Sequence, residues 1–218
     1  MRCLHTLMRR LLPAMAILLM ALAFPVLAQP VALEEGNQFL RLKAPQPVES
    51  GKKIEVIEFF SYLCPHCSDL EPFLQGWVKT LPEDVQFRRV PVMFQDRWVA
   101  LAKVYYTLDA LGAEARLSPE VFGAIHRRGT SLWQDKTFFD WAAAKGLDRT
   151  KVEDMYNSFG IGGKVNRARA IAASYQVQSV PLIVVDGKFV TNRVSSHQAM
   201  PAVVDALIAK ARAERPKG

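Results

Sequence analysis

The chain has 218 residues, of which 28 are lysine or arginine, 21 are aspartate or glutamate, and 50% are apolar. This length suits one domain, or one domain with a large insertion, and the ordinary composition excludes a disordered or collagen-like chain. Three cysteines are too few for a disulfide-stapled scaffold or for a four-thiolate metal site. The positions of the cysteines are therefore more informative than their number.

The first 28 residues have the pattern of a secretory signal peptide. Three arginines precede an apolar run over residues 11–22, and Val26-Leu27-Ala28 places small residues where signal peptidase reads them. A membrane anchor is the alternative, but the apolar run is shorter than the roughly 20 residues that span a bilayer. We therefore expect cleavage after Ala28.

Removal of this segment changes both the charge and the cysteine content of the chain. It would leave 190 residues, lower the net charge from +7 to +4, and remove Cys3. A small surplus without a long basic run indicates ordinary surface charge rather than a nucleic-acid interface. Cys64 and Cys67 would then be the only cysteines.

The N-terminal half of the mature chain predicts a strand–helix–strand unit. Residues 29–50 are rich in Pro, Gln and Glu, and predict a surface lead-in with a short extended segment at Gln38–Leu42. β-Branched and aromatic residues predict a buried strand over Lys53–Phe60 and a second strand over Val85–Val92. A helix over Pro65–Leu81 is expected between them.

Only helical patterns follow, from Gln95 to Ser174. Apolar residues at three- and four-residue steps predict a first helix that ends at Gly112. Ser118-Pro119 has the pattern of an N-cap followed by proline at the first helical position, so a second helix is expected to begin there. Three more helices are predicted, over Asp135–Lys145, Asp148–Phe159 and Lys164–Tyr175, with Gly146 and Gly160 as stops.

The C-terminal part predicts a hairpin and a helix. Leu182–Val185 and Lys188–Val190 are strand candidates, and Asp186-Gly187 between them favours a type I′ turn. Ser195 or Ser196 is expected to cap a last helix that runs to about Ala213. The whole order predicts an α/β fold, with a small mixed sheet, flanking helices and a helical insert.

The two remaining cysteines stand at the start of the first predicted helix. Cys64 precedes Pro65, which suits the first helical position because it lacks an N–H that would have no partner there. Free N–H groups and the helix dipole favour an anion at this point, so we expect the pKa of Cys64 to fall well below about 8.5. Cys67, one turn inside the helix, should be more buried and keep a higher pKa. Cys64 would then be the reactive sulfur, and Cys67 would resolve.

Three other interpretations of the cysteine pair compete with a redox role. A structural disulfide is possible, but its four-residue loop removes less denatured-state entropy than a long loop does. A zinc site would need two more ligands, and the mature chain offers only His66, His126 and His197 without a second cysteine pair. Haem attachment requires histidine directly after the second cysteine, where Ser68 stands. These residues alone favour a redox pair and leave the structural disulfide open.

The segment EFFSYLCPHC, from Glu58 to Cys67, resembles the active-site segment of the DsbA family, the exported thiol:disulfide oxidoreductases of Gram-negative bacteria. Ser179-Val180-Pro181 before a strand is similar to the cis-proline loop of that family. The element order, the helical insert and the N-terminal signal also match, so the resemblance covers essentially the whole mature chain. It is strongest toward β-proteobacterial members, and the Pro-His pair between the cysteines is its most discriminating element.

The resemblance implies a thioredoxin fold with an inserted all-helical domain. On this basis we expect a removed signal peptide over residues 1–28 and a first part of the thioredoxin-like domain over 29–94. A helical insertion would cover 95–165, and the second part of the thioredoxin-like domain would cover 166–218. Neither a cofactor nor a metal is expected.

The resemblance also implies a function. The protein would donate its Cys64–Cys67 disulfide to reduced, unfolded secreted proteins in the periplasm, through a mixed disulfide, as a monomer without a nucleic-acid partner. A DsbB-type membrane oxidase linked to quinone would reoxidise it. Two alternatives are an isomerase or reductase of the same fold and a redox-inert peptide-binding or chaperone module. The 22 residues between Ala28 and Gly51 leave no room for the dimerisation domain that exported isomerases usually carry.

Four further residues are candidates for the site. His66, as a cation or a ring N–H donor beside Cys64, would stabilise the thiolate. A trans bond is the default before Pro181, but the resemblance implies a cis bond that exposes the Val180 backbone for strand-like pairing with an extended substrate. Glu58 could be a surface residue at a strand edge. The resemblance instead implies a carboxylate buried beneath the pair, with a raised pKa, that assists proton transfer at Cys67.

Overall fold

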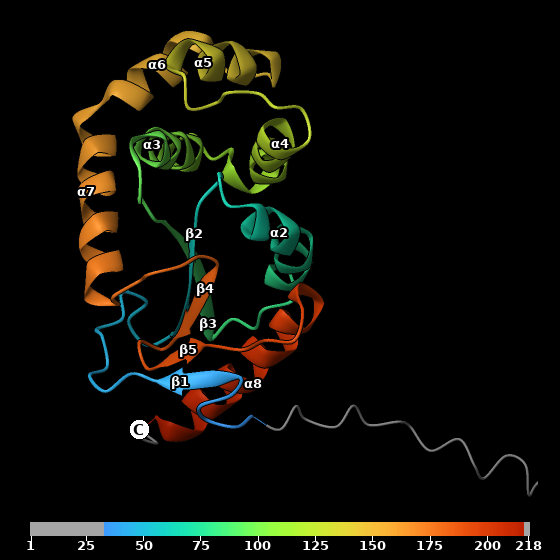
Figure 1. The fold of residues 1–218 in the computed structure, drawn as a ribbon. Coiled ribbons are helices and arrows are strands. Elements are labelled where there is room, and N and C mark those ends of the chain that lie inside the picture. Colours follow the sequence, from blue (N-terminus) through green and yellow to red (C-terminus); the bar gives the residue numbers. More distant parts are fainter. Residues whose placement is uncertain (1–32, 216–218) are drawn as a thin grey trace, which may run out of the picture. The chain divides into compact units, whose positions relative to one another are not determined.

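The computed structural model describes residues 33–215. The predicted signal peptide and its cleavage site lie outside the described residues. The described chain contains a five-stranded mixed sheet in the order β1-β5-β4-β2-β3 (Figure 1). The strands are β1 (Phe39–Arg41), β2 (Ile54–Phe60), β3 (Val85–Pro91), β4 (Leu182–Val185) and β5 (Phe189–Thr191), close to the predicted positions.

Two structural units share this sheet. In the first, β2, α2 (Pro65–Val78) and β3 form a parallel strand–helix–strand unit. In the second, β4 and β5 form an antiparallel hairpin that leads through a 3₁₀ turn (His197–Ala199) into α8 (Met200–Glu214). Because β4 pairs antiparallel with β2, the two units join into the central sheet of the thioredoxin fold, as the resemblance implied. Ser196 caps the 3₁₀ turn by accepting the N–H of Ala199 at 3.2 Å.

The hairpin turn is of the predicted type I′. Asp186 and Gly187 have φ values of 54° and 62°, and the Lys188 N–H donates to the Val185 carbonyl at 3.0 Å. Asp tolerates the left-handed region better than most residues do, and glycine adopts it without strain. Gly187 also packs directly against the Gln46 backbone, where any Cβ would clash. The backbone geometry of the turn therefore explains why Asp and Gly occupy these two positions.

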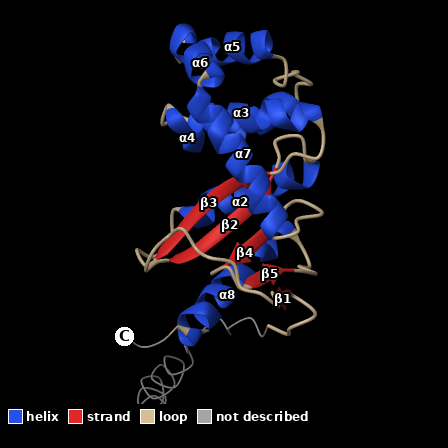
Figure 2. Cartoon of the chain, turned by 90° about the vertical axis from the view of Figure 1, so that its left-hand side faces the viewer, coloured by secondary structure: helices blue, strands red, loops and turns tan. Residues whose placement is uncertain are grey.

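Five helices lie between β3 and β4, as the sequence predicted. Figure 2 shows α3, α4, α5 and α6 gathered at one end of the sheet, while α7 extends from them along one sheet face. The helices are α3 (Asp96–Ala110), α4 (Glu114–His126), α5 (Asp135–Ala144), α6 (Arg149–Asn157) and α7 (Phe159–Ser174).

Two predicted helix boundaries are wrong. Ser118 does not cap α4, which begins a turn earlier at Glu114, and Pro119 lies inside the helix. The Ser118 hydroxyl is instead buried and bonds to Tyr62, so a tertiary contact replaces the predicted cap. Gly160 does not stop a helix either. It lies in the first turn of α7, where Ser158 accepts the N–H of Ile161 as the N-cap.

Both faces of the sheet are covered. In Figure 1, α7 lies on one side of the sheet, and α2 and α8 lie on the other. Alternate residues of β2 serve the two layers, since Val56 packs toward α2 and α8 whereas Ile57 and Phe59 pack toward α7. Every residue of β2 is buried, including Glu55 and Glu58, the two carboxylates in an otherwise apolar strand.

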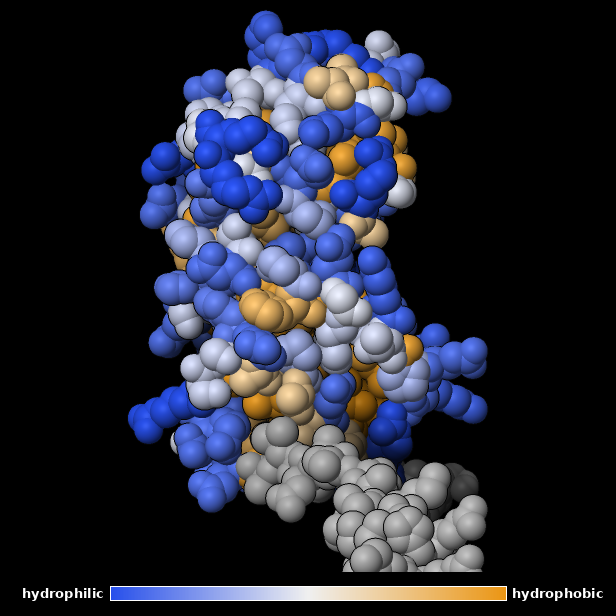
Figure 3. All heavy atoms as spheres, turned by 90° about the vertical axis from the view of Figure 1, so that its right-hand side faces the viewer, coloured by the Kyte–Doolittle hydropathy of each residue, from blue (hydrophilic) through white to orange (hydrophobic). Residues whose placement is uncertain are grey.

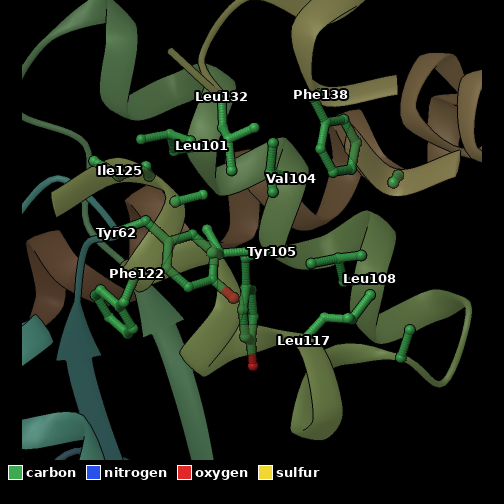
Figure 4. Packing of buried hydrophobic residues seen from close by; sticks show 14 of the residues in the cluster. Tyr62, Leu101, Val104, Tyr105, Leu108, Leu117, Phe122, Ile125, Leu132 and Phe138 are labelled. Atoms are coloured by element: carbon green, nitrogen blue, oxygen red, sulfur yellow. The ribbon is translucent and has the colours of Figure 1, made fainter. Parts of the chain in front are cut away.

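The helical region has its own core, which extends to the cysteines. The buried cluster that contains Cys64 and Cys67 also contains Phe60, Tyr62 and many residues of the inserted helices. Figure 4 shows part of it, with the rings of Tyr62, Tyr105 and Phe122 close to one another. The insert is therefore packed directly against the active-site segment.

The surface on the α2 and α4 side is mixed. Figure 3 shows hydrophilic side chains over most of this face, with the apolar ones in several separate areas. Between residues 33 and 215, no helix combines the length and apolarity required to cross a membrane.

Candidate active site

Cys64 is the N-cap residue of α2. Its backbone is extended, with φ −83° and ψ 116°, and Pro65 occupies the first helical position as predicted. The Cys64 sulfur accepts the backbone N–H of Cys67 at 3.2 Å, which is the hydrogen bond that Ser or Asp usually supplies at a cap. The reactive sulfur therefore satisfies one of the free N–H groups of the helix.

The two thiols have opposite pKa shifts. A hydrogen bond from the Cys67 side chain is the largest cause that lowers the pKa of Cys64, and the backbone N–H groups of Cys67 and His66 lower it further. Burial is the largest cause that raises the pKa of Cys67, whose side chain is fully enclosed. The surroundings of Cys64 thus favour its thiolate form, and those of Cys67 favour its protonated thiol form.

The loop before β4 lies against the Cys64 sulfur. The Cys64 thiol is within 3.3 Å of the Val180 carbonyl oxygen, to which it can donate. The peptide bond between Val180 and Pro181 is cis, in agreement with the resemblance. The fold thus brings together residues 116 positions apart in the sequence.

His66 is exposed in the first turn of α2. Its backbone N–H is among the groups that lower the pKa of Cys64, while its ring lies beside the ring of His197, with 5.9 Å between the centroids. Both histidines and Pro181 line a cavity of about 410 Å³ next to the cis-proline loop. From the sequence, His197 was only a possible zinc ligand, and nothing placed it beside the cis-proline loop.

Glu58 is buried, so the interpretation as a surface residue at a strand edge is wrong. It lies in β2, which has β3 on one side and β4 on the other, and its side chain is 1% exposed. Burial is the largest cause that raises the pKa of Glu58, and the nearby Arg89 only partly offsets this. The charge of Glu58 in turn raises the pKa of both cysteines.

Arg89 connects Glu58 to two further carboxylates. Its guanidinium lies 2.7 Å from Glu58, 2.5 Å from Glu71 and 2.9 Å from Glu114, which come from β2, α2 and α4. Burial raises the pKa of Glu71 to about 7. Sequence reasoning missed this cluster, because the pairing of Arg89 with Glu58 comes from the register between β2 and β3.

Comparisons with known proteins agree with this geometry. A family model described as a DSBA-like thioredoxin domain matches residues 74–207. The thiol:disulfide interchange protein DsbA of Burkholderia cepacia is 38% identical over 185 residues, which cover 84% of this chain and 87% of the relative. The chain belongs to the DsbA family.

Structural comparison places the fold in the same family. The crystal structure of Pseudomonas aeruginosa DsbA, 37% identical, superimposes with a TM-score of 0.79 over 83% of this chain and 95% of that one. Reduced DsbA1 from Neisseria meningitidis, 26% identical, gives a TM-score of 0.77 over 85% and 98%. Relatives from Burkholderia and Bordetella agree with the predicted likeness to β-proteobacterial members.

The family membership establishes the activity. This DsbA family member is a thiol:disulfide oxidoreductase, which passes a disulfide to substrate proteins through a mixed disulfide. The site described above contains one cysteine pair with which to do so. The interpretation as a purely structural disulfide is therefore wrong.

Proposed function

We propose that Cys64 is the sulfur attacked by substrates and that Cys67 is the leaving group. A substrate thiolate attacks the Cys64 sulfur of the oxidised pair, the Cys64–Cys67 bond breaks, and Cys67 departs as a thiolate that takes up a proton. A second substrate thiolate then attacks the substrate sulfur of the mixed disulfide, and Cys64 leaves as a thiolate. The substrate loses two electrons, and the cysteine pair gains them.

The opposite pKa shifts of the two thiols are the observation that carries this assignment. A thiol with a lowered pKa is the better leaving group, so the mixed disulfide at Cys64 resolves readily toward oxidised substrate. The raised pKa of Cys67 means that this sulfur, once released, is quickly protonated and does not attack the mixed disulfide in reverse. The lowered pKa of Cys64 thus favours release of the oxidised substrate, and the raised pKa of Cys67 suppresses the reverse attack.

Four neighbouring residues would support the transfer. The Val180 backbone, adjacent to the Cys64 sulfur, would pair with an extended substrate segment, and Pro181 would hold that backbone in place. Glu58 would accept and return the proton at Cys67, since it is buried nearby and acts on the pKa of that thiol. The ring of His66 would add to the stabilisation of the Cys64 thiolate.

We also propose the cellular setting. Substrates would be reduced, unfolded proteins that enter the periplasm, and a DsbB-type membrane oxidase linked to quinone would reoxidise the pair in a protein that acts as a monomer. Residues 1–28 would direct export. N-terminal sequencing of the protein from a periplasmic extract should start at Gln29, and a sequence that starts at Met1 would rule out cleavage.

The domain boundaries stay a proposal. Helical insertion over residues 95–165 would divide the thioredoxin-like domain into parts over 29–94 and 166–218. The second boundary falls inside α7, which continues from the insert onto the sheet. Limited proteolysis should therefore leave α7 intact, and a preferred cut within that helix would count against a rigid connection.

The reduction potential of the pair against glutathione tests the direction of the activity. We expect a value well above the roughly −270 mV of a reductive thioredoxin, whereas a value near it would indicate a reductase. The same glutathione equilibrium on His66→Ala should give a lower potential, and an unchanged value would restrict His66 to its backbone contribution.

The assignment of the two sulfurs has a separate test. Cys67→Ser should accumulate a mixed disulfide with a reduced peptide, and Cys64→Ser should not.

A further inference from the structure

The turn that leads into Cys64 is held by the helical insert. Residues Ser61 to Cys64 form a β-turn closed by the Cys64 N–H, which donates to the Ser61 carbonyl at 3.0 Å. The Ser61 hydroxyl also accepts the N–H of Leu63 at 3.2 Å. Within this turn, the carbonyl of Tyr62 belongs to the central peptide unit.

His126, the last residue of α4, contacts that central peptide. Its Nε2 lies 2.8 Å from the Tyr62 carbonyl oxygen. Because a carbonyl only accepts, Nε2 must carry the proton and donate. The imidazole ring is half-buried and stacks on Phe122, with 6.2 Å between the ring centroids and 27° between the planes. The ring is therefore fixed in position by packing as well as by the hydrogen bond.

The same face of α4 holds Tyr62 at two more points. Ser118, Phe122 and His126 are four residues apart, so they form one stripe along the helix. The Ser118 hydroxyl lies 2.9 Å from the Tyr62 hydroxyl, and the Phe122 ring lies edge-on to the Tyr62 ring at 5.0 Å. This α4 stripe thus holds the hydroxyl, the ring and the backbone carbonyl of a residue two positions before the reactive sulfur.

The central peptide of a β-turn, between its second and third residues, is the part whose orientation differs between turn types. Types I and II differ by a flip of this peptide, and the flipped form requires a positive φ at the third residue. That residue is Leu63, which does not have a positive φ here. The bond from His126 favours the observed orientation and opposes the flip. It thereby fixes the direction from which the chain enters Cys64.

We propose that His126 is a positioning residue for Cys64, which holds the active-site turn so that the reduced sulfur stays at the helix cap. In the oxidised state the bond to Cys67 fixes Cys64 covalently, whereas in the reduced state only hydrogen bonds and packing fix it. The contact from His126 therefore stabilises the reduced pair more than the oxidised pair. This inference rests on the redox function of the pair, which the wild-type chain tests independently.

The experiment compares three variants with the wild-type chain by glutathione equilibrium and by titration of thiolate absorbance. Loss of a hydrogen bond worth about 1 kcal/mol changes an equilibrium about fivefold. His126→Ala should thus shift the glutathione equilibrium about fivefold toward the oxidised pair, or about 20 mV, and raise the pKa of Cys64. His126→Gln, whose Nε2 can donate from a similar place, should restore both values. Arg127→Ala, the exposed neighbour, should match the wild type.

Two results would overturn the proposal. One is that His126→Ala keeps the reduction potential and the Cys64 pKa of the wild type. Even if this variant unfolds more easily, the role of His126 would then be structural only. The other is a failure of His126→Gln to restore either value. Nitrogen NMR of His126 gives an independent readout, since a ring with the proton on Nδ1 alone could not donate to Tyr62. A wild-type chain that fails to oxidise peptides would count against the proposed function instead.

Discussion

Cys64 and Cys67 are the same chemical group three residues apart, and their surroundings make them different. Cys64 occupies a helix cap, where N–H groups converge on its sulfur, whereas Cys67 is one turn deeper and fully enclosed. The sequence predicted this difference, because Pro65 marks the first helical position and so places Cys64 at the helix start, where a thiol has a lowered pKa. It could not predict Arg89 as the partner of Glu58, since the pairing depends on the register between two strands.

Glu58→Gln separates the two effects of this carboxylate. Its charge raises the pKa of both cysteines, so its removal should lower the pKa of Cys64 and raise the reduction potential, by about 30 mV for each pKa unit. If Glu58 also carries the proton of Cys67, peptide oxidation should become slower and its pH profile should change. A higher potential with slower oxidation is the expected pair of results.

Glu55→Gln is the matched control, because Glu55 is a buried carboxylate of the same strand that pairs with Arg88 instead. It should leave both quantities close to the wild type. Unchanged oxidation kinetics and an unchanged pH profile in Glu58→Gln would end the proton-transfer role.

At the scale of elements, one guanidinium from β3 holds carboxylates from β2, α2 and α4. Three acidic groups around one cation leave an excess of negative charge in a buried place, which is costly unless a proton is retained. The raised pKa of Glu71, about 7, is the consequence. The cluster joins the sheet, the active-site helix and the insert, and it makes this joint sensitive to pH.

The free energy of unfolding should therefore fall as pH rises from about 5 to about 8. Folded Glu71 keeps a proton that the unfolded chain has lost above about 4.3, so the folded state binds more protons in this window. The contribution is at most about 4 kcal/mol, from a difference of about 2.7 pKa units at 1.36 kcal/mol per unit. Glu71→Gln should reduce the slope in urea denaturation of the oxidised chain, in which the cysteines do not titrate. Glu83→Gln, in an exposed loop, should keep it, and equal slopes in all three chains would contradict the assignment.

The helices also show where sequence patterns are reliable. The β4–β5 turn was predicted because Asp-Gly determines a local backbone geometry, and the observed φ values confirm it. The start of α4 was predicted wrongly because Ser118 and Pro119 have the local pattern of a cap, while the Ser118 hydroxyl is used by Tyr62, 56 residues earlier. The backbone geometry of a turn can be predicted from the residues next to it in the sequence. A buried polar contact between distant residues cannot, because it depends on the folded structure.

At the scale of the whole molecule, the redox state and the stability of the chain are linked through Cys64. A thiolate with a lowered pKa stabilises the folded reduced chain, and the oxidised chain has no such group. The sequence predicted the lowered pKa of Cys64 from its place at a helix start and the helical insert from the element order, and the resemblance to the DsbA family implied the thioredoxin fold. The sequence could not predict that the insert reaches the active-site turn, because no pattern in α4 marks His126 as its partner.

The stability difference between the reduced and oxidised chains should depend on pH. The pKa of Cys64 is lowered on folding, so its contribution is fully present above the unfolded value of about 8.5 and is lost as pH falls through the folded value. Urea denaturation with and without a thiol reductant, from pH 8 down to pH 4, should show the advantage of the reduced chain shrinking. In Cys64→Ala this trend should be absent. A difference that stays constant with pH would contradict the lowered pKa.

The sulfur that reacts in this protein is also the atom that caps a helix. While a substrate is covalently attached, Cys64 is no longer an anion, and the N–H of Cys67 loses most of its acceptor. When the oxidised substrate leaves, the thiolate returns and the first turn of α2 regains its cap. The step that releases the substrate therefore also restores the N-cap hydrogen bond of α2, so the stability of the helix itself favours substrate release.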